Sequence, residues 1–187
     1  MKKWSKIVIC LLIIGCLSGC TLPMQSNKFP AWKTSSLLDA RVLEDGRTVD
    51  GWQGLNVTET AKCKWYNFTV TSIEEVNEYA GYKAQDGKKL VHAQIRIENT
   101  SDKDVYLFDG DFALLWDLDK NVYGYAYSLD PYTDTMLKNE MVIKVGETIE
   151  VDTVYEISSN LSKPYAIYYA EQYSDQVQGN KYFVYIK

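Results

Sequence analysis

The stretch KLVHAQIRIENT, residues 89–100, decides the fold class because its side chains alternate between two kinds. The apolar set consists of Val91, Ala93, Ile95 and Ile97, and the polar set consists of His92, Gln94, Arg96 and Glu98. Successive side chains of a strand point to opposite faces, so this period of two predicts a β-strand with one buried and one wet face.

The same period, or a short apolar run, recurs in both directions along the chain. The further strand-like runs are KWYNFTVTS (64–72), FALLWDL (112–118), ETIEVDTVYEI (147–157), PYAIYYAEQY (164–173) and KYFVYI (181–186). Turn-forming residues separate these runs, which gives about seven strands and predicts an antiparallel sandwich or barrel.

Two segments have a less certain pattern. SIEEVNEYAGY, residues 72–82, has a capping pattern at Ser72 and Glu75, so we expect a connection with at most a short helical turn before Gly81. RVLEDGRTV, residues 41–49, contains the Asp-Gly pair of a two-residue hairpin turn, so an appended hairpin is expected there.

The amino-terminal segment has the layout of a secretory signal. Three lysines precede an uncharged run from Ile7 to Leu17, which is shorter than the ~20 residues needed to span a bilayer. The segment closes with LSGC, residues 17–20, which resembles the lipobox of bacterial lipoproteins, and IIGC at 13–16 is a poorer match. We therefore expect lipidation of Cys20 and a location on the outer face of the cell membrane.

These features divide the chain into four parts. We expect a signal peptide at residues 1–19, a lipidated, flexible tether at 20–36, a segment of uncertain structure at 37–62, and the β-sandwich at 63–187. The tether prediction rests on its polar, proline-containing sequence without apolar periodicity.

The net negative charge of the chain limits the partners that it can bind. Residues 1–19 contain three lysines and no acids, so removing them changes the formal net charge from −5 to −8. Nucleic-acid binding depends on cationic contacts to phosphate, so nucleic acid is an unsuitable partner. An anionic membrane surface is also unfavourable, so the lipid itself must supply the attachment. After lipidation Cys63 is the remaining cysteine, and a single thiol is more often an apolar filler than a nucleophile.

An ordered set of short motifs resembles a known family. The set runs from Trp65 and Phe68 through YAGY (79–82), IENTSD (97–102), DFALLWD (111–117) and VGET (145–148) to VYEI (154–157). It resembles a lipoprotein domain of Gram-positive bacteria that is often labelled as similar to a telomeric-repeat-binding factor. That family is related in fold to immunoprotective extracellular proteins. The resemblance covers residues 55–187 and implies an immunoglobulin-like, antiparallel β-sandwich. The family has no established activity, so the resemblance implies no catalytic residues.

Catalytic and metal-binding patterns are weak. His92 lies on a polar strand face, where a solvated side chain is expected, and it has no recognisable triad or zinc partners. Asp117, Asp119 and Asn121 resemble the start of an EF-hand calcium loop. However, such a loop requires glycine at its sixth position and glutamate at its twelfth, and this sequence has valine and serine there. Further oxygens could come from Asp109 with Asp111, or from Asp130 with Asp134. We expect a turn there, and no metal, cofactor or catalytic residue.

Tyrosine is the remaining signal. The chain has 15 tyrosines in 187 residues, and Tyr123, Tyr125 and Tyr127 would share one face of a strand. Tyrosine suits the recognition of sugars, peptides and proteins, but it also favours half-buried strand positions for packing alone. We expect a lipid-anchored, non-catalytic binding module with a protein or cell-wall partner, in which these three tyrosines contribute to binding. The alternatives are a cell-envelope hydrolase that uses paired carboxylates and a structural surface lipoprotein.

Overall fold

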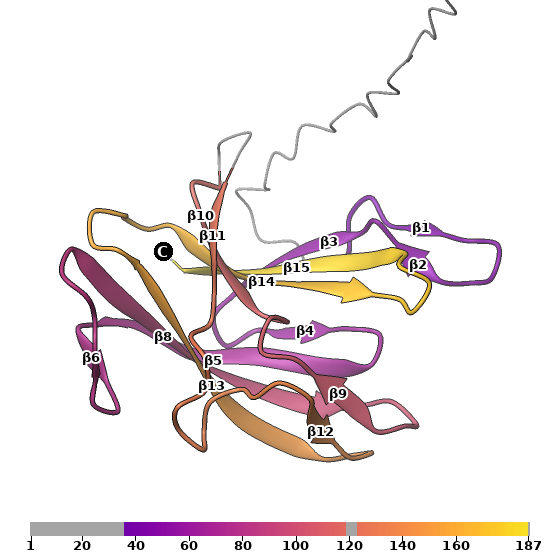
Figure 1. Ribbon diagram of the computed structural model, residues 1–187. Coiled ribbons are helices and arrows are strands. Elements are labelled where there is room, and N and C mark those ends of the chain that lie inside the picture. Colours follow the sequence, from indigo (N-terminus) through magenta and orange to yellow (C-terminus); the bar gives the residue numbers. More distant parts are fainter. Residues whose placement is uncertain (1–35, 119–122, 187) are drawn as a thin grey trace, which may run out of the picture.

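The chain folds into two packed β-sheets (Figure 1). The computed structural model describes residues 36–118 and 123–186, and within these ranges the regular elements are strands. The five-stranded sheet has the order β11 (Gly124–Tyr127), β10 (Ala113–Trp116), β14 (Tyr165–Gln172), β15 (Gln178–Ile186) and β3 (Trp52–Asn56). The four-stranded sheet has the order β13 (Thr148–Ser158), β8 (Lys88–Asn99), β5 (Tyr66–Val76) and β4 (Thr60–Lys62).

Three short antiparallel pairs surround these sheets. They are β1 (Arg41–Val42) with β2 (Thr48–Val49), β6 (Glu78–Tyr79) with β7 (Tyr82–Lys83), and β9 (Val105–Leu107) with β12 (Met141–Ile143). In the part of the chain that the structure describes, no helix has the length and apolar character needed to cross a membrane.

The core lies between the two sheets and follows the alternation seen in the sequence. The inward residues of β8 include Val91, Ala93, Ile95 and Ile97, and all four are buried. Tyr165, Ile167 and Tyr169 of β14 face them from the five-stranded sheet. Burying apolar area contributes roughly 25 cal/mol per Å², and this double layer of large side chains can support the fold without a disulfide.

The expected class, an all-β, immunoglobulin-like sandwich, is confirmed. The structure has 15 strands where about seven were predicted, because it includes short pairs and edge strands that carry little periodic signal. The sheets are also not wholly antiparallel, since β15 and β3 run parallel, with Val184 opposite Leu55.

The prediction of a helical turn after Ser72 is wrong. β5 continues to Val76, and the register shifts by one residue between Val70 and Ser72, which is a β-bulge. The bulge precedes Ile73 and Val76, which lie opposite Ala93 and Leu90 on different faces of the sheet, so their spacing of three residues does not mark one face of a helix. The segment then forms the tight hairpin β6–β7 through Ala80 and Gly81, which have φ values of 46° and 87°.

The hairpin at residues 41–49 is present, with a longer loop than predicted. Leu43 N–H donates to the Arg47 carbonyl at 2.8 Å, and Gly46 N–H donates to the Leu43 carbonyl at 2.9 Å. These bonds enclose residues 44–46, so the loop has three residues instead of two. Positive φ at Gly46 makes this turn possible.

The sandwich begins earlier than the expected boundary at residue 63. β3 pairs with β15 in one sheet, and β4 pairs with β5 in the other. The uncertain segment at 37–62 therefore contributes a strand to each layer. Its strands are too short for their period to be recognised in the sequence.

Candidate binding face on the five-stranded sheet

Tyr123, Tyr125 and Tyr127 lie on or beside β11, which forms one edge of the five-stranded sheet. Tyr125 is opposite Leu115, and Tyr127 is opposite Ala113, so both rings project to the same side. Tyr123 packs against the same outer cluster as Leu115. The three tyrosines thus share one face, as their spacing predicted. The structure shows that this face points away from the core. The turn before them, including Asp119 and Asn121, lies outside the described residues.

Two of these rings are open to solvent. Tyr125 is 56% exposed and Tyr127 is 58% exposed, although both belong to a regular strand. Their ring centroids are 5.5 Å apart with an interplanar angle of 71°, which is a favourable edge-to-face arrangement. The pair therefore presents a preformed aromatic surface at the edge of the sheet.

The outer surface continues across the other strands of the sheet. In the β14–β15 register, Tyr168 pairs with Phe183, and their rings lie 5.2 Å apart. Tyr185 stacks on Phe183 at 6.5 Å, and Trp52 of β3 packs into the same cluster. We call this surface the aromatic face and define it by Trp52, Tyr125, Tyr127, Tyr168, Phe183 and Tyr185.

The remaining positions of this face are small or neutral apart from one lysine. Register places Ala113 and Leu115, Ala166, Gly54 and Lys181 on the same side. Among the strand positions that register assigns to this side of the described sheet, between Trp52 on β3 and Tyr127 on β11, none is Asp or Glu. A carboxylate outside the strands, Asp39, accepts the Trp52 indole N–H at 3.0 Å at the edge of the face. In a chain with 25 acidic residues, such a surface is unusual.

Burial stabilises the neutral form of two tyrosines of the aromatic face, Tyr168 and Tyr185. It raises the pKa of Tyr168 to about 12, and the nearby Tyr123 and Tyr127 add to this effect. Burial also raises the pKa of Tyr185 to about 12. The face can therefore offer aromatic rings and hydroxyl groups without a negative charge at neutral pH.

The opposite outer face, on the four-stranded sheet, has a different character. Glu74 of β5, His92 of β8 and Asp152 of β13 lie side by side on it. His92 Nε2 is 2.8 Å from Asp152 Oδ1, and His92 Nδ1 is 3.3 Å from Glu74 Oε1. The Tyr79 ring covers His92 at a centroid distance of 4.5 Å, and the Tyr79 hydroxyl donates to Asp152 at 2.8 Å.

This network corrects the expectation for His92. Its side chain is only 14% exposed and holds two carboxylates, so it is not a solvated surface residue. The sequence could not show this because Glu74, Tyr79 and Asp152 come from three other strands. The network involves no nucleophile, and it joins the β6–β7 hairpin to the sheet.

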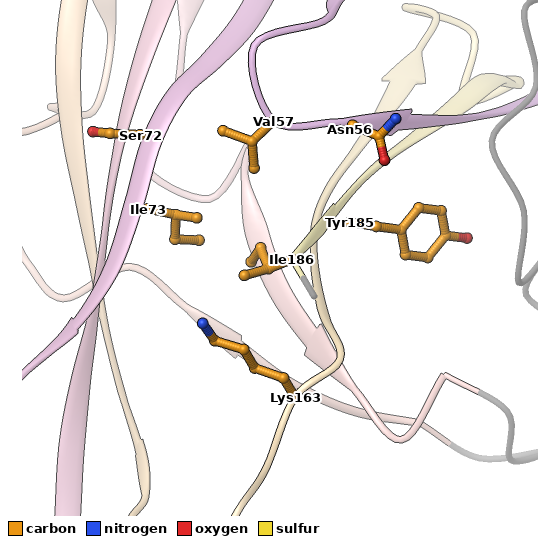
Figure 2. A pocket seen from close by; sticks show the side chains of 7 residues that line it. All are labelled: Asn56, Val57, Ser72, Ile73, Lys163, Tyr185 and Ile186. Atoms are coloured by element: carbon orange, nitrogen blue, oxygen red, sulfur yellow. The ribbon is translucent and has the colours of Figure 1, made fainter.

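A pocket of about 480 Å³ adjoins the aromatic face where β3 and β15 end, near Asn56 and Tyr185 (Figure 2). Val57, Ile73 and Ile186 form its apolar part, and Tyr185 belongs to both the pocket and the aromatic face. Figure 2 shows the Lys163 amine directed toward Ile73 and Ile186. Asn56 and Ser72 supply further polar groups, and this lining includes no carboxylate or histidine.

Two of the acidic groups suggested for metal binding flank Gly110, which lies close to the Tyr127 ring. Asp109 and Asp111 occupy the β9–β10 loop, where Asp111 accepts the Phe108 N–H at 2.9 Å. Burial raises the pKa of Asp111 to about 6; the bond from Phe108 opposes this shift, and the charge of Asp109 adds to it. Within residues 36–118 and 123–186, no group of three His, Cys, Asp or Glu side chains is placed to hold a metal ion.

Cys63 is a free, largely buried thiol next to a buried carboxylate. Burial raises its pKa well above the ordinary value, and Glu171 adds to this effect, so the reactive thiolate is disfavoured. Glu171 itself accepts bonds from the backbone N–H groups of Lys64 at 2.6 Å and Asn180 at 3.0 Å. These contacts indicate a structural role for Glu171, which joins two segments of backbone, and for the neighbouring Cys63.

Sequence reasoning identified the tyrosines of β11 and missed the other half of the face. Trp52 lay in the segment of uncertain structure, and Tyr168, Phe183 and Tyr185 were recognised only as members of strand-like runs. Their alternation with buried residues was visible, but both alternating sets in PYAIYYAEQY and KYFVYI are apolar or aromatic. Cys20 lies outside the described residues, so its lipidation stays a prediction.

Fold and face together define an immunoglobulin-like β-sandwich with an aromatic outer surface. Comparisons with protein-family models and with curated proteins found no match. Among solved structures, a candidate lipoprotein of Bacillus subtilis, ycdA, is similar with a TM-score of 0.52 and 13% identity. The match covers 70% of this chain but only 39% of ycdA.

Two further structures match an equal share of the chain. The yjhA protein of Bacillus subtilis has a TM-score of 0.52 and 17% identity, with coverage of 70% of this chain and 99% of yjhA. A functionally unknown protein of Listeria monocytogenes has a TM-score of 0.50 and 10% identity, with coverage of 70% and 82%. At these identities the similarity establishes the fold alone.

Proposed function

We propose that the protein is a lipid-anchored, extracytoplasmic binding module without catalytic activity, and that the aromatic face is its binding surface. The observation that carries the proposal is the exposure of Tyr125 and Tyr127 on a sheet face whose strand positions include no Asp or Glu. Side chains of this kind offer a large contact area and lose little conformational entropy on binding.

The proposed location rests on the signal sequence and on LSGC at residues 17–20. The similarity of the fold to ycdA, a candidate lipoprotein, agrees with it. Acyl chains on Cys20 would hold the domain at the membrane, since each buried methylene contributes ~0.8 kcal/mol. A protein or cell-wall polymer can then meet the aromatic face, and the net negative charge disfavours nucleic acid.

Anchoring is tested by the variant Cys20→Ala. Wild-type protein is expected in the membrane fraction and should incorporate a labelled fatty acid, whereas Cys20→Ala should incorporate none. The matched control is Cys16→Ala, which alters the poorer lipobox and should leave the label in place. Labelling of Cys20→Ala at the wild-type level would refute the proposed anchor.

Binding is tested by cross-linking in cells followed by capture of the protein. The wild type is compared with the double variant Tyr125→Ser/Tyr127→Ser, and with Tyr132→Ser as a control. Tyr132 is 40% exposed and contacts Tyr79 and Tyr82, on the opposite side of the sandwich. A partner recovered with the wild type and the control but lost with the double variant is expected. Recovery of no partner or polymer would exclude a protein or polymer as the ligand of the aromatic face.

A further inference from the structure

We propose that the aromatic face lies against the lipid bilayer, with the headgroup–acyl boundary as its ligand. The inference names a partner for the surface assigned above, and it rests on the proposed anchoring at Cys20. It is carried by the position at which the chain enters the face, by the chemistry of the face and by the distribution of charge between the two outer surfaces.

The described chain begins at the edge of this face. Leu38 and Trp52 form a backbone bridge, with N–H to carbonyl distances of 3.0 and 3.1 Å. Paired residues share a side of the sheet, so Leu38, which is 39% exposed, extends the aromatic face beyond Trp52. Ser36 is sixteen positions from Cys20, a length that spans at most ~58 Å when fully extended. An anchor at Cys20 therefore limits the distance of this edge of the sheet from the membrane, and the chemistry of the surface decides which face makes contact.

The chemistry of the face suits the interfacial region of a bilayer. Tryptophan and tyrosine concentrate at that depth because their rings are apolar and their tips are polar. Tyr168 and Tyr185 stay neutral, since burial raises the pKa of each to about 12. The surface is also continuous, because register places its aromatic residues on neighbouring strands of one sheet.

Charge distribution gives the orientation. The strand positions of the aromatic face carry Lys181 and no acid, and one carboxylate, Asp39, lies at its edge, where it accepts the Trp52 indole N–H at 3.0 Å. The opposite outer face carries Glu74, Glu150, Asp152 and Glu156 beside Arg96, so it is the more acidic of the two. The net charge of the whole chain predicted repulsion from an anionic membrane. Screening over ~8 Å at physiological ionic strength makes the local charge of the contacting surface more important. The protein would therefore present the aromatic face to the lipid and its acidic face to the solvent.

The corner pocket extends this surface with a cation. Tyr185 joins the pocket to the aromatic face, and Lys163 and Asn56 supply an amine and an amide at its lining (Figure 2). An ammonium group beside apolar walls fits a phosphate attached to an acyl-bearing headgroup. Lys163 and Lys181 would thus meet headgroup phosphates while the rings lie beneath them.

The first experiment measures the face without its anchor. Residues 21–187 are sedimented with vesicles of phosphatidylcholine containing one quarter phosphatidylglycerol. We expect measurable binding, lowered by about tenfold or more in Tyr125→Ser/Tyr127→Ser, because each lost ring removes buried apolar area. Tyr132→Ser should bind as the wild type does. Absence of wild-type binding, or equal binding by the double variant, would overturn the proposal.

The second experiment tests orientation at the membrane. Residues 20–187 are coupled through the Cys20 thiol to a maleimide phospholipid in nanodiscs, since burial disfavours reaction at Cys63. Radical oxidation should then modify Tyr125 and Tyr127 several-fold less than in the lipid-free protein, and Tyr132 equally in both. Equal oxidation of Tyr125 and Tyr127 with and without lipid would contradict the inference.

Other occupants give separate results. If Tyr125 and Tyr127 are already protected in the lipid-free protein, then residues 20–35 or a second copy covers the face, and the proposal is wrong. Sedimentation without vesicles distinguishes these two causes by mass. Capture of a protein through the face, together with failure to bind vesicles, would overturn the bilayer contact and leave the proposed binding function intact. A failure of the Cys20 labelling test would affect the anchor alone.

Discussion

At the scale of single residues, Asp152 shows how the acidic side of the molecule is stabilised. Burial by itself would raise the pKa of this carboxyl, but bonds from groups that include His92 and Tyr79, together with the charge of His92, outweigh burial and hold the pKa below its usual value of 3.8. The charged form is therefore favoured by folding. This contribution is present above the unfolded pKa and is lost as the pH falls through the folded pKa.

Replacing Asp152 with asparagine should lower the free energy of unfolding at pH 7 by about 1–3 kcal/mol, because a buried, charge-assisted network loses its acceptor. The difference between wild type and Asp152→Asn should shrink as the pH falls below 3.8. Urea denaturation at several pH values measures both effects. Asp130→Asn, at an exposed position, should match the wild type throughout. A stability difference that does not change with pH would contradict this account.

Asn99 and Gly146 show residues whose local role follows from the sequence. Asn99 Oδ1 accepts the Ser101 N–H at 2.9 Å, which forms an Asx-turn at the end of β8. Gly146 has φ of 73°, a conformation that a side chain with a β-carbon resists. Both roles could be predicted because they depend on the nearest neighbours in the chain.

At the scale of elements, the β10–β11 hairpin positions the exposed tyrosines. Trp116 pairs with Gly124, and its indole occupies the space that a side chain at position 124 would need. The ring packs against the core, as expected for a tryptophan in an apolar run. This inward contact fixes the side of the strand on which Tyr125 and Tyr127 project.

Gly124→Ala tests this arrangement. A β-carbon at position 124 would lie 2.0 Å from Trp116 Nε1, so the indole must move. We expect a loss of about 1–3 kcal/mol in the free energy of unfolding and a change in tryptophan fluorescence. The control is Gly110→Ala, since its β-carbon would meet only the Tyr127 ring, at 4.0 Å. A Gly124→Ala protein with wild-type stability would show that the hairpin is not held by this contact.

At the scale of the whole molecule, both layers depend on strands from the segment before residue 63. β3 closes the edge of the five-stranded sheet, and β4 closes the edge of the other. Glu171 adds a connection between layers, since it accepts bonds from Lys64, just beyond β4, and from Asn180 of β15. Removing the early segment would expose two sheet edges and part of the core at once.

A chain of residues 63–187 is therefore expected to be unfolded or aggregated, whereas a chain of residues 36–187 should unfold cooperatively. Circular dichroism during thermal unfolding distinguishes the two. Cooperative unfolding of residues 63–187 near the melting temperature of residues 36–187 would contradict the role assigned to β3 and β4.

The sequence by itself determined the class of fold and the proposed location at the outer face of the cell membrane. A period of two is a local property of the chain, so β8 and β13 were predicted with the correct inward residues. The aromatic face depended on the tertiary structure, because alternation divides a strand into two faces without saying which one meets the core. In β14 and β15 both faces carry tyrosine or phenylalanine, so composition could not separate the buried Tyr169 from Tyr168. Only the packing of one sheet on the other assigned Tyr125 and Tyr127 to the outside, since that packing buries one face and leaves the other to solvent or a partner.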